Sequence, residues 1–187
     1  MRAMVVMLAC AAAVAVAGAG GAAAQEAARP KATPGPVFMK YGPVFDVPHV
    51  DLTPDPTAVH KVVFDVTESP DDTSAVNPGI VSLARFFNLY ARAGVSPEHL
   101  QLAIVAHGAA TKDVIGHAGY RKRYGADNPN LELMAALVDK GVRVYVCGQA
   151  LAARGVARDE LAPDVKVAPS ATAALLQLQS EGYRVVR

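Results

Sequence analysis

The chain has 187 residues, of which 52% are hydrophobic, and its 18 basic and 17 acidic side chains leave a formal charge of +1. This length is sufficient for one domain with its own hydrophobic core. A nearly neutral charge gives no reason to expect a nucleic acid or an anionic membrane as a partner, which disfavours those classes of binding protein.

The first 24 residues have the pattern of a cleavable signal peptide. Arg2 supplies one positive charge, residues 3–17 are apolar, and small residues then lead to Ala24. A basic start, an apolar middle and a small-residue exit are typical of secretion signals. The alternative, a retained anchor, is disfavoured because the apolar stretch is shorter than the roughly 20 residues of a membrane-spanning helix. We therefore expect a periplasmic or secreted mature protein that has no membrane contact after cleavage.

Residues 25–59 are predicted to form a proline-rich leader or arm. The segment contains Pro30, Pro34, Pro36, Pro43, Pro48, Pro54 and Pro56. Since proline removes a backbone donor and disfavours helix in the residue before it, we expect no long regular element here. The apolar side chains of Tyr41, Val44, Phe45 and Val47 can pack the second part of this arm on the domain or on a neighbouring subunit.

Strands and helices are predicted to alternate from residue 60 to residue 187. Apolar, β-branched runs predict strands at 61–66, 102–106, 142–146, 165–167 and 183–186. Asn77 followed by Pro78 is typical of a helix start. One buried face of that helix is indicated by the spacing of Ile80, Leu83, Ala84, Phe87 and Ala91. A weak helical stretch is expected at 111–124, and further helices after Asn128-Pro129, at 148–154 and at 170–181.

This alternation predicts the fold class. Short apolar strands connected by helices are typical of a parallel sheet that is covered on both faces. We therefore expect a three-layer α/β/α domain with a mainly parallel sheet of about five strands. The short strands near the C-terminus can pair with each other at an edge, in an order that the sequence does not fix.

Several reactive side chains follow the predicted strands. The first strand ends at Asp65, with Glu68 just beyond it, the second at His107-Gly108 and the third at Cys147. Ligands of open α/β sheets gather at the carboxyl ends of the strands. If these strands are neighbours, a thiol, an imidazole and carboxylates share one edge of the sheet.

Cys147 is the candidate reactive group. Cys10 would leave with the signal peptide, so Cys147 is the only thiol of the predicted mature chain and no intramolecular disulfide can form. It closes a strand and opens a helix, where backbone N–H groups favour a thiolate, and Gly148 allows close approach to a persulfide or anion. The alternative is a buried, inert cysteine that serves only packing.

His107 is a candidate base or ion-pair partner for this thiol. The alternative is a strand-end histidine that bonds to the backbone. Asp65 and Glu68 either orient the histidine or cap the region of Asn77. A copper site at Cys147 and His107 would have only two ligands. Because Cys-x-x-Cys, nucleotide-binding glycine loops, zinc-ligand spacing and Gly-x-Ser-x-Gly are absent from the sequence, we expect no cofactor and no metal.

One run carries a resemblance to a known family. Residues 146–156 read Val-Cys-Gly-Gln-Ala-Leu-Ala-Ala-Arg-Gly-Val. This run resembles the stretch around the sulfur-carrying cysteine of DsrE-like proteins, in which a strand ends in Cys and x-x-Ala-x-x-x-Arg-Gly follows. The strand at 61–66, the helix with Phe86, Phe87 and Tyr90 and the strand end at 105–108 resemble the exported, uncharacterised branch of that superfamily. The resemblance covers residues 60–187, which we interpret as a DsrE-like domain.

The resemblance implies a domain that assembles into homo-oligomers such as trimers or hexamers. It also implies that Cys147 accepts sulfur as a persulfide and exchanges it with a donor or acceptor protein, surrounded by the amides of Gly148, Gln149 and Ala150. The role of His107, and of Asp65 and Gly108 as further binding residues, is inferred only from their positions at the ends of predicted strands. We expect a sulfur carrier, at most sulfurtransferase-like; the alternative is a non-catalytic module that binds a small ligand or an assembly partner and has a structural cysteine.

Overall fold

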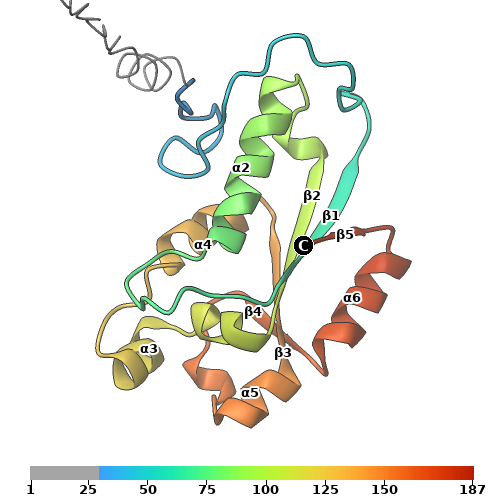
Figure 1. Cartoon of the computed structure of the whole chain (residues 1–187). Coiled ribbons are helices and arrows are strands. Elements are labelled where there is room, and N and C mark those ends of the chain that lie inside the picture. Colours follow the sequence, from blue (N-terminus) through green and yellow to red (C-terminus); the bar gives the residue numbers. More distant parts are fainter. Residues whose placement is uncertain (1–29) are drawn as a thin grey trace, which may run out of the picture. The chain divides into compact units, whose positions relative to one another are not determined.

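The computed structural model describes residues 30–187 (Figure 1). The predicted signal peptide, residues 1–24, and the first residues of the predicted arm lie outside the described residues. Residues 32–187 form one compact unit. Within residues 30–187, no helix combines the length and the apolar character needed to cross a membrane.

Five parallel strands form a single sheet. They are β1 (His60–Val66), β2 (Leu100–Ala106), β3 (Arg143–Cys147), β4 (Val165–Ala168) and β5 (Arg184–Val186). Their order across the sheet is β4-β3-β2-β1-β5, and all four neighbouring pairs are parallel. The predicted α/β fold with a five-stranded parallel sheet is therefore confirmed.

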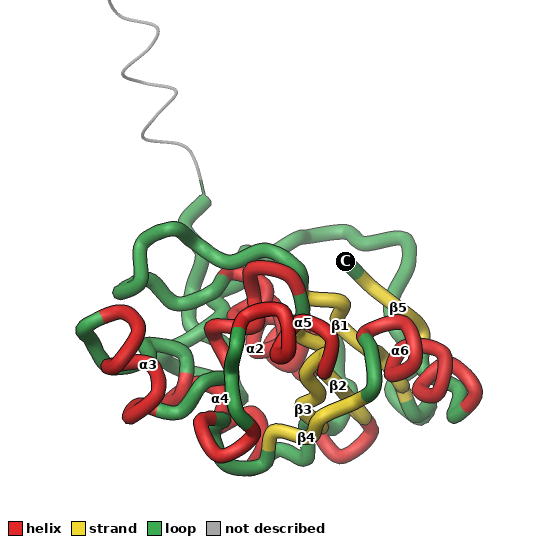
Figure 2. The backbone as a smooth tube through the Cα atoms, turned by 90° about the horizontal axis from the view of Figure 1, so that it is seen from below, coloured by secondary structure: helices red, strands yellow, loops and turns green. Residues whose placement is uncertain are grey.

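Helices cover the two faces of this sheet. They are α2 (Pro78–Arg92), α3 (His117–Tyr124), α4 (Leu131–Val138), α5 (Gly148–Arg154) and α6 (Ala171–Ser180). Helices α2 and α4 pack on one face, and α6 packs on the other, where it contacts all five strands (Figures 1 and 2). Since α6 connects β4 to β5, it carries the chain from one edge of the sheet to the other. The two short C-terminal strands therefore lie at opposite edges and do not pair with each other.

Side chains alternate between two apolar cores because successive residues of a strand point to opposite faces. Val62 and Ile104 lie in the larger core under α2 and α4. Val63 and Val105 lie in the smaller core under α6, together with Cys147. The smaller core contains five alanines from the strands and helices, which allows α6 to pack close to the sheet.

Helix α2 begins and ends as its sequence indicates. The Oδ1 of Asn77 accepts a hydrogen bond from the N–H of Gly79 at 2.7 Å, and Pro78 occupies the first helical position. The four predicted core residues from Ile80 to Phe87 are buried, whereas Ala91 is half-buried. Gly94, with a positive φ of 88°, follows the end of the helix. The predicted buried face is therefore confirmed for its first two turns.

Two other predicted helices differ from the structure. The stretch at 111–124 is divided into a 3₁₀ helix, Gly108–Val114, and α3, because Ile115 forms a β-bridge with Leu161 between them. The helix expected directly after Asn128-Pro129 begins only at Leu131. Asn128 instead accepts from the N–H of Asn130 at 2.9 Å, which makes a turn before α4.

A buried amide on α2 fixes the proline-rich arm to the domain. The Oδ1 of Asn88 accepts from the backbone N–H groups of Val37 and Phe38, at 3.1 and 2.8 Å. Its Nδ2 donates to the carbonyls of Phe38, Tyr41 and Gly42. A side chain with no exposed surface thus satisfies five backbone groups of the arm.

Only part of the arm is covered. Phe38 and Val44 are buried, and Phe38 belongs to the larger core. Phe45 and Val47 are exposed, although the sequence indicated them as packing residues. The arm therefore packs on its own domain through residues 33–44 and leaves apolar side chains uncovered further along.

We predict that Asn88→Ala lowers the free energy of unfolding by about 3 kcal/mol, because it leaves buried amides and carbonyls of the arm without partners. Urea denaturation followed by circular dichroism measures this change. Limited proteolysis should also show faster cleavage between residues 33 and 59.

The matched control is Gln179→Ala, which removes an exposed amide from α6 and should change stability by less than about 0.5 kcal/mol. Equal stability of the two variants, with an unchanged cleavage pattern, would show that Asn88 does not anchor the arm.

Candidate functional site

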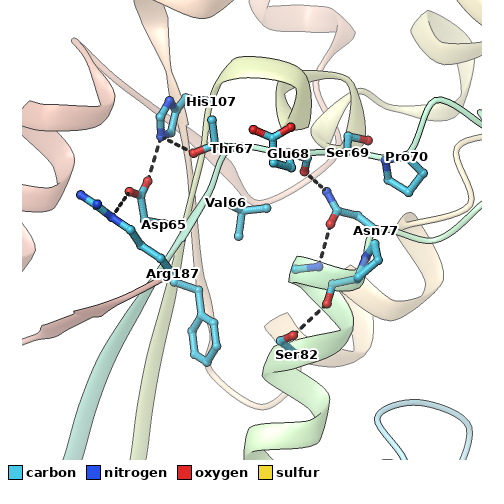
Figure 3. Close-up of a pocket in the computed structure, with 13 residues that line it drawn as sticks. Asp65, Val66, Thr67, Glu68, Ser69, Pro70, Asn77, Ser82, His107 and Arg187 are labelled. Atoms are coloured by element: carbon cyan, nitrogen blue, oxygen red, sulfur yellow. Dashed lines mark hydrogen bonds and ion pairs between the residues drawn. The ribbon is translucent and has the colours of Figure 1, made fainter.

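Asp65 and His107 form a hydrogen-bonded pair at the carboxyl ends of β1 and β2. The His107 Nε2 lies 2.8 Å from Asp65 Oδ1 and 3.2 Å from Thr67 Oγ1 (Figure 3). The Asp65 side chain is only 9% exposed, and that of His107 is 27% exposed. The expectation that Asp65 orients the histidine therefore agrees with the structure.

This pair fixes the orientation of the imidazole ring. An ionised carboxylate only accepts hydrogen bonds, so the Nε2 next to Asp65 must carry a proton. In the neutral ring the remaining nitrogen, Nδ1, is then the basic one. Asp65 thus keeps the ring in place through Nε2 and leaves Nδ1 as the acceptor nitrogen of the neutral ring.

Cys147 occupies the neighbouring strand at the same level. Ala106 of β2 pairs with Val146 of β3. His107 directly follows Ala106, and Cys147 directly follows Val146. His107 is extended, with φ of −155° and ψ of −174°, so it continues the register of β2. Neighbouring strands lie about 4.8 Å apart, which places the two backbones side by side. The prediction that these strands are neighbours is confirmed.

The thiol of Cys147 is buried. Cys147 is 6% exposed, and its side chain packs in the smaller core with Ala150, Ala168 and Ala171. No hydrogen bond connects its Sγ to His107 or to any other group of residues 30–187. Cys147 caps the N-terminus of α5, but this helix has only seven residues and its first amides give no side-chain cap bond. Cys147 thus closes β3 at the start of α5 with little of its surface exposed, and its reactivity stays a prediction.

Three of the other predicted binding residues, Gly148, Gly108 and Ala150, have packing roles in this structure. A Cβ on Gly148 would lie 2.8 Å from the carbonyl oxygen of Ala168, so glycine permits close approach of β4. Gly108 has a positive φ of 56° and lies against Thr67. Ala150 is buried, and Gln149 is exposed with its Nε2 3.4 Å from a backbone carbonyl. Contact of these residues with a ligand stays a prediction.

A buried polar cluster holds the loop between β1 and α2. Asp113, which is 1% exposed, accepts from Ser69 Oγ at 2.9 Å, from Asn77 Nδ2 at 2.6 Å and from Asn130 Nδ2 at 3.2 Å. Burial raises the pKa of the Asp113 carboxyl above its usual value, and the hydrogen bonds oppose this shift. Glu68 enters the cluster through its backbone, whose carbonyl accepts from Asn77 Nδ2 at 2.7 Å, while its carboxylate is exposed.

A cavity of about 830 Å³ adjoins the Asp65–His107 pair. It lies between the end of β1, the loop after it, the start of α2 and the C-terminal residue Arg187 (Figure 3). Cys147 does not line it. Within residues 30–187, no three histidine, cysteine, aspartate or glutamate side chains are grouped to hold a metal ion.

Sequence reasoning missed two residues of this region. Arg187 lies with its Nε 3.5 Å from Asp65 Oδ2, a contact that nothing in the local sequence indicates because it depends on β5 pairing with β1. Asp113 lies in the 3₁₀ helix Gly108–Val114, and nothing in the sequence around it indicates that it is buried. Thr67, which the sequence places at the end of the first strand, lies with its Oγ1 3.2 Å from His107 Nε2.

Comparisons with known proteins give a family and a fold. The model of the DsrE/DsrF-like family matches residues 60–187. A search of curated protein sequences finds no match. The solved structure of the protein of unknown function MTH1491 from Methanobacterium thermoautotrophicum is 21% identical, with a TM-score of 0.50, and the match covers 68% of this chain and 98% of that one. The ychN protein from E. coli is 17% identical, with a TM-score of 0.48, over 68% and 99% of the two chains.

We predict that Asp113→Asn lowers the free energy of unfolding by about 1–2 kcal/mol at pH 4, since an amide group would then face another N–H donor. This difference between wild type and variant should shrink as the pH rises to 7. The native carboxyl binds its proton more tightly than the unfolded one, so its stabilising contribution is present below the unfolded pKa and is lost as the pH rises through the folded pKa.

Denaturation of both proteins between pH 3.5 and 7 tests the sign. Because the two proteins share every other titrating group, their difference isolates Asp113. A difference that grows with pH would contradict the raised pKa.

Proposed function

Because the chain belongs to the DsrE/DsrF-like family, we propose that it relays sulfur, with Cys147 as the residue that carries sulfur as a persulfide. The observation that carries the proposal is the placement of Cys147 beside His107 on neighbouring parallel strands. Asp65 supports it by orienting the imidazole at 2.8 Å.

The proposed reaction is a redox-neutral transfer. The Cys147 thiol loses its proton to His107, and the thiolate attacks the outer sulfur of a donor persulfide, R–S–SH. A new S–S bond forms at Cys147 while the donor S–S bond breaks. The donor leaves as R–S⁻, which takes the proton from His107. A second thiol removes the outer sulfur from Cys147 in the same way.

The partner thiol must come from another molecule. Cys147 is the only cysteine in residues 30–187, so that part of the chain has no second cysteine to resolve the persulfide. We therefore propose a separate donor and acceptor protein. With cleavage of residues 1–24, this exchange would take place in the periplasm or outside the cell.

Assembly into a homo-oligomer is a further part of the proposal. The exposed apolar side chains of Phe45, Val47, Val50 and Leu52 lie in one segment of the arm. Such a cluster favours contact with another protein surface. A neighbouring subunit is the partner that the family membership favours.

A second candidate function follows from the burial of Cys147. A thiol that is 6% exposed and packed among alanines also suits a structural role. The protein would then be a binding or assembly module whose cysteine does not react. Access to the thiol distinguishes the two functions.

We predict that the protein gains one sulfur atom when it is incubated with a low-molecular-weight persulfide. Intact-mass spectrometry measures the gain, which reductant should reverse. Cys147→Ser should show no gain, while Asp65→Asn should load at least about tenfold more slowly because His107 loses its orienting partner.

Glu98→Gln, which removes an exposed carboxylate at the opposite ends of the strands, serves as the control and should load at the wild-type rate. A protein that neither gains sulfur nor reacts with a water-soluble alkylating reagent would favour the second candidate function. Equal loading rates for Asp65→Asn and the control would remove Asp65 and His107 from the mechanism.

A further inference from the structure

The cavity at the end of β1 has the composition of a small-molecule site. Its volume of about 830 Å³ lies within the range of such sites, which are mostly apolar with a few placed polar groups. Its apolar walls are formed by Phe64, Val66, Pro70 and Pro78. Three charged side chains line the same space: Asp65, Glu68 and Arg187.

The Asp65 carboxylate has one well-bonded oxygen and one loosely bonded oxygen. Oδ1 lies 2.8 Å from His107 Nε2, whereas the nearest charged partner of Oδ2 is Arg187 Nε at 3.5 Å. No hydrogen bond to Oδ2 is present within residues 30–187. The Asp65 side chain is 9% exposed and lines the cavity, so its second oxygen can accept from a cationic or hydrogen-bonding group that enters the cavity.

Arg187 supplies that partner only weakly. Its side chain is 86% exposed, and its Nε lies 3.5 Å from Asp65 Oδ2. A contact at this distance, with the guanidinium almost fully in solvent, contributes little to stability. The guanidinium can therefore be displaced from Asp65 at little cost.

The start of α2, which also borders the cavity, does not provide an anion site. The N–H of Gly79 donates to Asn77 Oδ1, and the N–H groups of Ile80 and Val81 both donate to the Asn77 carbonyl. These amides are therefore not available to an anion. The carboxylates of Asp65 and Glu68 face the single guanidinium of Arg187, so the cavity favours cationic over anionic ligands.

We propose that this cavity binds a small organic cation, an ammonium or guanidinium group on an apolar body, and that the cation replaces Arg187 at Asp65 Oδ2. The apolar body lies against Phe64 and the proline walls. Glu68 adds a second negative charge at the rim. The proposal does not depend on sulfur transfer at Cys147, because Cys147 does not line the cavity.

The test is a titration of the native protein with benzylammonium, followed by NMR chemical shifts of backbone amides. Benzyl alcohol and benzoate are the matched neutral and anionic probes. We expect saturable shifts at residues 64–69, 77–79 and 107 with benzylammonium, and binding at least about fivefold weaker with the other two. Binding should also weaken as salt increases, since an ion pair drives it.

Three variants complete the test. Arg187→Gln removes the competing guanidinium at an exposed position and should bind benzylammonium about threefold or more tightly. Glu68→Gln should bind it more weakly. Cys147→Ser should bind it like wild type, so failure of the sulfur-transfer proposal would be visible separately.

Several results would overturn the inference. They are the absence of saturable shifts with benzylammonium, equal or tighter binding of benzyl alcohol or benzoate, shifts located away from the cavity, and unchanged or weaker binding in Arg187→Gln. Because the Arg187 side chain is 86% exposed, its substitution leaves the fold intact and keeps the test decisive.

Discussion

The parallel pairing of β1, β2 and β3 is the constraint on which the rest of this structure depends. The register of the pairing places Ala106 opposite Val146. The residues that follow them, His107 and Cys147, therefore lie side by side at the carboxyl ends of the strands. Asp65 reaches the same edge from β1 and points to the same face as His107. A shift of one residue in any of these pairings would turn a side chain to the opposite face and separate the group.

The face that receives these side chains is covered by a single helix, α6. A ten-residue helix that spans five strands can lie close to them only over small side chains, and this explains the alanines of the smaller core. The same close packing buries Cys147. The sulfur-carrier role proposed for this thiol and the tight contact of α6 oppose each other, since access for a sulfur donor requires space that the alanines leave closed.

Buried polar groups organise the loops around the sheet. Asn88 connects α2 to the arm through five backbone groups, and Asp113 connects the loop after β1 to the segment before α4. Each side chain supplies hydrogen bonds that a helix or a strand would otherwise provide, because proline-rich and irregular segments cannot satisfy their own amides. The position of Asn77 in the Asp113 cluster also explains how the start of α2 and the wall of the cavity are held together.

The sequence by itself determined the alternation of strands and helices and the parallel sheet, because apolar periodicity is a local pattern. It also determined that Asp65, His107 and Cys147 stand at the carboxyl ends of strands, because strand ends can be recognised locally. It placed the start of α2 correctly, since Asn77 and Pro78 act within their own turn. It failed after Asn128, where the same two-residue pattern makes a turn before the helix begins. Only the tertiary structure decided the burial of Cys147, the contact of Arg187 with Asp65 and the opposite edges taken by β4 and β5. These features depend on pairings between segments far apart in the chain, and no local pattern records them.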